Sequence, residues 1–252
     1  MSVYALADLH GRLDLLIEGL QYLGPEDEIY FLGDAADRGP HGWECIQYIL
    51  SDKRFTYIKG NHEDLLCKAF GDNIKPEKFN EDSFMWNSKM NLWFWKGGEV
   101  TFNAIIDDTT ISAEEKIEII NELKRLPFCK IYNNEQGQRV LLSHAGCDNF
   151  NVADRWGEDE FLWDRNHLMF YDTWYGKDDE IIVHGHTPIN YMVKEQQSYA
   201  KNFNKYPPDW NGQGAYWYSE NHKCNIDTGA VWSNNTVLLN LDTWEETVIT
   251  IA

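Results

Sequence analysis

Aspartate and arginine residues crowd the segment Gly33–Gly39, which directly follows the apolar run Glu28–Leu32. A short run of Ile, Tyr, Phe and Leu that stops at a glycine is typical of a buried strand that ends in a turn. Asp34, Asp37 and Arg38 would be costly in an apolar core, whereas carboxylates gathered at a strand end can bind a cation in a cleft. This segment is therefore the first candidate for a functional site.

Four other strand-like runs also end in short polar segments, which contain more residues of the kinds that bind metals. They are Asp8–Gly11, Gly60–Glu63, Ser143–Gly146 and His184–Pro188. In an open α/β sheet, ligands collect at the carboxyl ends of the strands, so five such ends can converge on one site. A single Asp-x-His or Gly-Asn-His is usually a polar turn, but the five segments together favour a shared metal site.

The composition limits the class of protein. The chain has 252 residues, 43% of them hydrophobic, and we predict one domain over 1–252 because all five segments must meet. A net charge of -19 argues against a nucleic-acid partner, which requires a cationic surface. The five cysteines are dispersed and predict reduced thiols, not a disulfide framework or a zinc site. The lack of a leader or long apolar segment predicts a cytoplasmic protein with no membrane partner.

The elements that position the polar segments follow from the hydrophobic pattern. Leucine and isoleucine spacing predicts helices over 13–23 and 43–50, and Ser112 with Glu115 forms a capping box for a later helix. The strand-helix-strand-helix-strand order near the N-terminus predicts a parallel sheet covered by helices.

Residues 64–110 interrupt this alternation and are rich in aromatic side chains. Phe84, Trp86 and the run Trp93–Trp95 have no regular spacing. The segment is either a cap-like insertion packed beside the site or a locally aromatic core, and the pattern leaves both interpretations open.

The second half of the chain predicts a second, mixed sheet packed on the first. Strand-like runs lie at 140–142 and 181–183, then around 216, 225–226, 237–241 and 247–251. The segment Gln196–Tyr218, rich in Asn, Tyr, Pro and Gly, is expected to be an exposed loop.

The ordered motifs resemble those of the PPP metallophosphatases, most closely their bacterial and bacteriophage serine/threonine phosphatase branch. The five segments carry the resemblance from residue 8 to residue 188, and Asn225–Ala230 resembles the C-terminal segment of that branch. Ala7 stands where the family usually has glycine, and we expect this small residue to leave the site intact. The resemblance implies a four-layer α/β/β/α sandwich, here with a small aromatic-rich cap insertion over about 64–110.

The resemblance also implies two divalent metal ions, with Mn²⁺ preferred and Fe or Zn as alternatives. It assigns Asp8, His10 and Asp34 to the first ion, and Asp34, Asn61, His144 and His186 to the second. Two metals about 3.5–4 Å apart generate hydroxide at neutral pH and neutralise charge on a phosphoryl group. His184 competes with His186 as a ligand, and the motif alignment favours His186, which leaves His184 in a supporting or structural role.

The catalytic roles are likewise implied by the resemblance. His62 would be the general acid that protonates the leaving oxygen, with Asp37 orienting and charging its imidazole. Arg38 would grip phosphoryl oxygens with its planar fork of donors. A second arginine is expected downstream, and Arg165 is preferred to Arg155.

We therefore predict a two-metal phosphomonoesterase, of the serine/threonine phosphatase kind, in which metal-bound hydroxide attacks the phosphorus directly. Its partners would be a phosphorylated protein or a small phosphoester. Symmetrical dinucleoside tetraphosphate hydrolysis is the alternative within the same class, because the aromatic insertion can stack an adenine. A non-catalytic metal-binding interaction protein is the alternative from another class.

Overall fold

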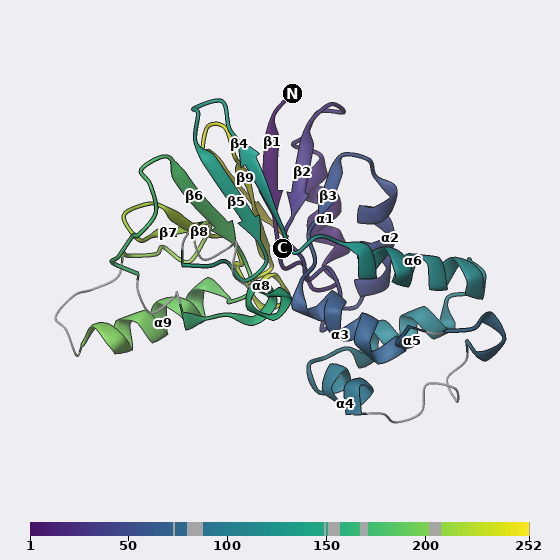
Figure 1. Ribbon diagram of the computed structural model, residues 1–252. Helices are drawn as coiled ribbons and strands as arrows, with labels where there is room; N and C mark the ends of the chain where they lie inside the picture. Colours follow the sequence, from purple (N-terminus) through teal and green to yellow (C-terminus); the bar gives the residue numbers. More distant parts are fainter. Residues whose placement is uncertain are drawn as a thin grey trace.

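Two five-stranded sheets form the centre of the protein (Figure 1), whose computed structural model describes residues 1–72, 74–79, 88–148, 150, 157–166, 171–201 and 208–251. The first sheet consists of β1 (Val3–Leu6), β2 (Glu28–Phe31), β3 (Phe55–Tyr57), β9 (Asn235–Asn240) and β10 (Glu246–Thr250). The second consists of β4 (Cys129–Asn133), β5 (Arg139–Ser143), β6 (Glu180–His184), β7 (Tyr216–Tyr218) and β8 (Lys223–Asn225). Their strand orders are β10-β9-β1-β2-β3 and β4-β5-β6-β8-β7.

Helices cover the outer faces of both sheets. The helices of the described residues are α1 (Leu13–Leu20), α2 (Gly42–Ser51), α3 (Asn61–Phe70), the 3₁₀ helix η1 (Pro76–Lys78), α4 (Ser88–Trp95), α5 (Glu99–Asp107), α6 (Ala113–Arg125), α8 (Glu158–Trp163), α9 (Ile189–Ala200) and α10 (Ala230–Ser233), and not all of them lie on a sheet. Leu16 of α1 and Ile46 of α2 share one buried cluster with Phe31 of the first sheet, and Met192 of α9 packs near Tyr216 of the second. The predicted α/β/β/α layers are confirmed.

The inner faces of the two sheets form a second core between them. Ala5 and Val237 of the first sheet and Val140 and Val183 of the second belong to one buried apolar cluster. Removing such side chains from water is the main force that holds two sheets together. The polar strand ends at the margin of this core are thereby held at fixed positions.

The strand register brings the motif segments to a common edge. β1, β2 and β3 are parallel, with Leu6 paired to Phe31 and Phe31 paired to Tyr57. In the second sheet β5 and β6 are also parallel, with Leu142 paired to Val183. Because paired strands end level with one another, the polar segments that follow them start side by side.

The prediction for the C-terminal strands needs a correction. β9 and β10 belong to the first sheet, where β9 pairs antiparallel with β1 (Tyr4 with Asn240), and not to the second sheet. All residues of β9 are buried, so its sequence pattern does not distinguish between two sheets that both offer apolar faces. β4, antiparallel to β5, was not predicted, because none of its residues is buried and its sequence therefore lacks a core-facing apolar pattern.

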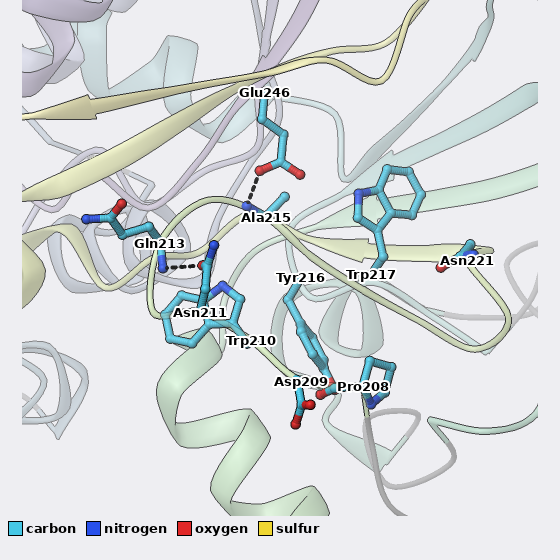
Figure 2. Close-up of a pocket in the computed structure, with 10 residues that line it drawn as sticks. All are labelled: Pro208, Asp209, Trp210, Asn211, Gln213, Ala215, Tyr216, Trp217, Asn221 and Glu246. Atoms are coloured by element: carbon cyan, nitrogen blue, oxygen red, sulfur yellow. Dashed lines mark hydrogen bonds between the residues drawn. The ribbon is translucent and has the colours of Figure 1, made fainter.

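The exposed loop predicted over 196–218 is wrong at both ends. Gln196 lies in α9 and is fully buried, with its Oε1 accepting a hydrogen bond from the Tyr216 hydroxyl. Tyr216, drawn in Figure 2 among the residues that line a surface pocket, and Tyr218 are buried in β7. A Tyr side chain can be buried in a core when its hydroxyl has a hydrogen-bond partner. The composition of the segment, typical of a loop, does not reveal this burial. Residues 202–207 lie outside the described part of the chain.

The aromatic insertion contains α4 and α5, which lie beside α3 and α6 (Figure 1). Trp93 and Phe102 are buried in the main core, whereas Trp95 is 77% exposed. Phe84 and Trp86 lie outside the described residues. Within those residues, no helix combines the length and apolar character needed to cross a membrane.

Candidate metal centre

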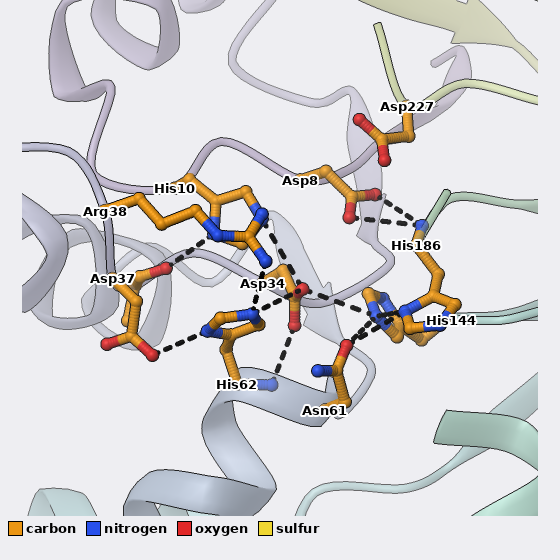
Figure 3. A network of polar contacts seen from close by, with 12 residues as sticks. Asp8, His10, Asp34, Asp37, Arg38, Asn61, His62, His144, His186 and Asp227 are labelled. Carbon is orange, nitrogen blue, oxygen red and sulfur yellow. Dashed lines mark hydrogen bonds and ion pairs between the residues drawn. The ribbon is translucent and has the colours of Figure 1, made fainter. Parts of the chain in front are cut away.

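The five polar segments meet between the two sheets, and Figure 3 shows their side chains pointing toward one another. The six predicted metal ligands are all buried: Asp8, His10, Asp34, Asn61, His144 and His186. Buried polar and charged groups require partners of opposite character. The contacts among these side chains therefore indicate what the site is built to bind.

Three atoms with lone pairs face one another on one side of the site. Asn61 Oδ1 lies 2.8 Å from His144 Nε2 and 2.9 Å from His186 Nδ1, and these nitrogens are 3.1 Å apart. His144 Nδ1 donates a hydrogen bond to the Leu32 carbonyl oxygen at 2.8 Å, so Nε2 of the neutral ring carries a lone pair. A carbonyl oxygen and an imidazole lone pair repel each other at such distances unless a cation attracts both. The donor set fits a metal ion with nitrogen and oxygen ligands.

The protonation of these histidines agrees with metal binding. Burial lowers the pKa of both His144 and His186. Their rings are therefore neutral at physiological pH, which is the form that coordinates metals. His186 Nε2 is buried without a hydrogen-bond partner, which leaves Nδ1 as the atom through which this ring contacts the cluster.

Asp34 stands at the centre, between the two halves of the site. Its Oδ2 lies 3.6 Å from His10 Nε2 and 3.5 Å from His144 Nε2. Its Oδ1 accepts a hydrogen bond of 2.9 Å from the backbone N–H of His62, in the first turn of α3. The N-terminus of a helix stabilises a negative charge. Asp34 is the residue shared by both candidate ligand groups, His10–Asp34–His62 and Asp34–His144–His186.

Asp8 is placed differently from the other predicted ligands. Within the described residues, the group that holds His10 and Asp34 contains His62 in place of Asp8. Both Asp8 carboxylate oxygens accept from the His186 backbone N–H at 3.1 Å. Burial, together with the nearby Asp227 and Asp34, raises the pKa of Asp8 well above its usual range. Burial also raises the pKa of Asp227 to about 7. This excess of buried carboxylates is a second reason to expect cations here.

His62 and Asp37 form a buried hydrogen-bonded pair. His62 Nδ1 donates to Asp37 Oδ2 at 2.6 Å, and the indole Nε1 of Trp93 donates to the same oxygen at 2.7 Å. Burial alone lowers the pKa of His62, but the Asp34 and Asp37 carboxylates outweigh it and raise the pKa above its usual value. The imidazole is therefore disposed to carry a proton, as the predicted acid requires.

Arginine and lysine side chains gather at the same place. Arg38 donates through Nη1 to His10 Nε2 at 2.7 Å, and its Nη2 lies 2.8 Å from His62 Nε2, which can accept from it only while that ring is neutral. Arg165 donates from Nε to the Thr187 hydroxyl at 3.0 Å, next to His186. Burial, and then the charges of Arg165 and Arg38, lower the pKa of Lys96, which was not predicted as a site residue. Arg155 lies outside the described residues.

Glu63 ends the segment Gly60–Glu63, and its role was not predicted from the sequence. Its carboxylate accepts hydrogen bonds from the backbone N–H groups of Asp34, Ala35 and Gly60, and from the Tyr57 hydroxyl. It thus ties the segment after β2 to the start of α3. Its position as the third residue of a helix, where an acidic side chain reaches back to the N-cap, was the available signal.

The backbone at the site is strained. Six residues other than glycine adopt positive φ angles: Asp8 (52°), His10 (45°), Asp34 (60°), Asp37 (73°), Arg38 (66°) and His186 (70°). Gly33 (φ 92°) and Gly185 allow close approach, because a Cβ would lie against Gly60 N in the first case and against Asp8 Oδ2 in the second. Strained residues cluster where the fold must aim side chains at one point.

The two neighbouring histidines differ in their contacts. His186 faces Asn61 and His144, whereas the fully buried His184 contacts the Tyr218 hydroxyl through Nε2 at 2.7 Å and the Gly185 carbonyl oxygen through Nδ1 at 3.0 Å. Both ring nitrogens of His184 are therefore committed to other partners. This geometry supports the choice of His186 as the ligand.

We expect His186→Ala to lose one metal ion, because it removes a nitrogen that faces the cluster. His184→Ala should retain both ions and lose activity only by about 10–100-fold, as supporting residues typically do. Elemental analysis and turnover of an aryl phosphate, measured on both variants, check this. The reverse pattern would show that the motif is aligned on the wrong histidine.

The chain is similar to known phosphoesterases and phosphatases. The family model described as calcineurin-like phosphoesterase matches residues 1–212. Serine/threonine-protein phosphatase 2 of Escherichia coli K12 is 25% identical over 168 residues, which are 64% of this chain and 66% of that protein. A symmetrical bis(5'-nucleosyl)-tetraphosphatase of Coxiella burnetii is 26% identical over 58% of this chain and 42% of its own length. The corresponding protein of Pseudomonas fluorescens SBW25 is 23% identical over 97% of this chain and 93% of its own.

Solved structures share the fold. A metallophosphoesterase from Sphaerobacter thermophilus matches with a TM-score of 0.54 at 16% identity, over 100% of this chain and 89% of its own. A serine/threonine phosphatase from Saccharomyces cerevisiae matches with a TM-score of 0.57 at 12% identity, over 100% and 80%. Because the family model covers most of the sequence, and the fold and the candidate metal groups agree with it, the chain belongs to the calcineurin-like phosphoesterase family.

Proposed function

We propose that the protein is a two-metal phosphomonoesterase that acts on phosphoserine, phosphothreonine or small phosphoesters. The observation that carries the proposal is Asp34, which stands between two groups of ligand atoms beside a buried His62–Asp37 pair. Metal ligands next to an oriented proton donor are the parts that hydrolysis of a phosphoester requires.

Asn61, His144 and His186 would hold one divalent ion, and His10 with Asp8 the other, with Asp34 shared. Mn²⁺ suits this mixed nitrogen and oxygen set, and Fe or Zn would also fit it. When bound, the ions would activate water and offset the charge of the phosphoryl group.

The remaining residues would handle protons and phosphoryl oxygens. His62, aligned by Asp37, would give a proton to the leaving oxygen. Arg38 now donates to His10 Nε2. The lone pair of His10 Nε2 cannot bind a metal ion and accept from Arg38 at once, so coordination of His10 would free the Arg38 N–H. The planar Arg38 guanidinium is suited to bind a phosphoryl oxygen. Arg165, next to His186, would be the second such group.

A side-by-side assay tests the proposal. The purified protein, loaded with Mn²⁺, is given nitrophenyl phosphate, a phosphoserine peptide and a dinucleoside tetraphosphate, and its metal content is measured. Preferred turnover of the peptide supports the proposal, and preferred cleavage of the dinucleotide supports the alternative substrate. Bound metal without turnover of any of the three would point to a non-catalytic metal-binding protein and overturn the proposal.

Symmetrical dinucleoside tetraphosphate hydrolysis is the second candidate, because relatives carry that name and a third cation lies at the site. Lys96 lies 4.8 Å from the centre of the Trp95 ring and 5.7 Å from that of Trp163, whose ring contacts His186 edge-on. The chain has a net charge of -19, so a cluster of three basic residues is a local exception. Their positive charges could bind more than one phosphate group.

If the substrate is a polyphosphate, Lys96→Met should raise KM for the dinucleoside tetraphosphate roughly 10–100-fold, since a hydrogen bond to a charged group contributes about 1.5–3 kcal/mol. KM for nitrophenyl phosphate should change little. Steady-state kinetics of both substrates check this, with Lys89→Met as the matched charge control, since Lys89 is exposed in α4, the helix that ends just before Lys96. Equal effects of the two lysine substitutions would remove Lys96 from substrate binding.

A further inference from the structure

Three residues of the aromatic insertion bind the turn that carries Asp37 and Arg38. Trp93 Nε1 donates to Asp37 Oδ2 at 2.7 Å, the Asp37 N–H donates to Thr101 Oγ1 at 2.9 Å, and the Arg38 N–H donates to the Gly97 carbonyl oxygen at 3.1 Å. We call Trp93, Gly97 and Thr101 the insertion clamp. Asp37 and Arg38 both have positive φ angles, which require support from the surrounding structure. The clamp supplies that support on both residues.

The position of the Trp93 ring is fixed by its surroundings. Trp93 is fully buried, and its ring lies against those of Phe70, Phe94 and Phe102, with centroids 5.9, 5.9 and 6.4 Å away. The backbone of Gly98 passes so close that a Cβ there would lie against Trp93 Nε1. A ring packed this closely cannot rotate, so the direction of its N–H is fixed.

That direction determines how Asp37 meets His62. Asp37 Oδ2 accepts from both Trp93 Nε1 and His62 Nδ1, at 2.7 and 2.6 Å, whereas Oδ1 is buried with no partner among the described residues. A carboxylate with two donors on one oxygen is held against rotation. The imidazole hydrogen-bonded to it is then oriented as well, with Nε2 directed toward Asp34 and Arg38.

We propose that Trp93 is a positioning residue for His62, acting through Asp37, and that the insertion clamp thereby makes the aromatic insertion part of the proton-donating apparatus. The inference rests on the proposed function, in which His62 protonates the leaving oxygen. It explains why a segment that packs as core is also joined by hydrogen bonds to the site. It predicts that loss of one indole N–H alters the reaction selectively.

Trp93→Phe removes the N–H and keeps an aromatic ring in the core. Trp43→Phe is the matched control, because Trp43 is equally buried and its Nε1 donates to Asp108 Oδ2 at 2.9 Å, outside the site. We expect Trp93→Phe to slow a phosphoserine peptide by about 10–100-fold and nitrophenyl phosphate much less, because only the serine alkoxide needs the proton. Trp43→Phe should lower the unfolding temperature without this bias.

Two further measurements separate positioning from general damage. In an Asp37→Asn background, Trp93→Phe should add little further loss, because residues that act through one another are not additive. In ¹⁵N-histidine NMR spectra, the Nδ1–H proton of His62 should shift or broaden in Trp93→Phe and stay unchanged in Trp43→Phe. The spectra require no turnover, so they test the positioning even if no phosphoester proves to be a substrate.

Equal losses on both phosphoesters, additive losses in the Asp37→Asn background, or an unchanged His62 resonance in Trp93→Phe would each overturn the proposal. Absence of all turnover in the unmodified protein, with the His62 resonance still altered by Trp93→Phe, would instead overturn the proposed function and leave the positioning of His62 intact.

Discussion

Asp34→Asn is expected to lose both metal binding and turnover. The substitution keeps the shape of the side chain but removes a negative charge from the one residue that belongs to both ligand groups. Two adjacent dications depend on a shared carboxylate to offset their repulsion, so occupancy should fall from about two ions per chain toward zero. Loss of several kcal/mol of charge stabilisation corresponds to a fall in kcat/KM of roughly 10³-fold or more.

The measurement is elemental analysis with steady-state kinetics on an aryl phosphate, after equilibration with Mn²⁺. Asp52→Asn is the matched control, since Asp52 pairs with Arg54 at 2.6 Å and lies outside the site. The control should retain both ions and its rate. Full metal content and a near-normal rate in Asp34→Asn would show that Asp34 does not bridge.

His62→Asn is expected to separate acid catalysis from metal binding. A general acid contributes about 10²–10⁴-fold when the leaving group needs a proton. A serine alkoxide leaves poorly without one, whereas nitrophenolate leaves readily. The rate on a phosphoserine peptide should therefore fall by about that factor, and the rate on nitrophenyl phosphate far less, with both metals retained.

Asp37→Asn should show the same bias more weakly, because Asp37 acts only through its hydrogen bond to His62 Nδ1. The check is kcat on both substrates for both variants at saturating metal. The metal content of His62→Asn must also be measured, because His62 lies in one ligand group with His10 and Asp34 and its loss could release a metal ion. Release of the ion would assign His62 to the metal and not to the leaving group.

The parallel half of the fold could be predicted because its signals are local. The apolar runs before Asp8, Asp34 and Asn61 form paired strands of one sheet, and each ends where a glycine or polar residue interrupts it. The placement of β9 could not be predicted in the same way. Its partner β1 is more than 200 positions away in the sequence, and an apolar strand fits either of two facing sheets.

The candidate site was predictable as a set of residues and less so as a set of contacts. The resemblance of the motifs assigned His10, His144 and His186 as ligands, and the fold does bring these residues together around Asp34 and Asn61. The orientation of Asp8 toward the His186 backbone and the hydrogen bond from Trp93 to Asp37 depend on packing between distant segments. Aromatic residues without a regular period give no indication that one of them will donate a hydrogen bond to the Asp37 carboxylate.

The positive φ angles of the site residues set a limit on how stable this protein can become. Residues such as His10, Arg38 and His186 are held in a backbone conformation that costs about 1–3 kcal/mol each. The free energy of unfolding of a protein is of the order of 5–15 kcal/mol, so the strain at these turns lowers it by a substantial fraction. Substitutions that relax them would raise thermal tolerance and misdirect the side chains that face Asp34. The protein is thus subject to a trade-off between stability and activity at these turns, and gains in robustness must come from elsewhere in the fold.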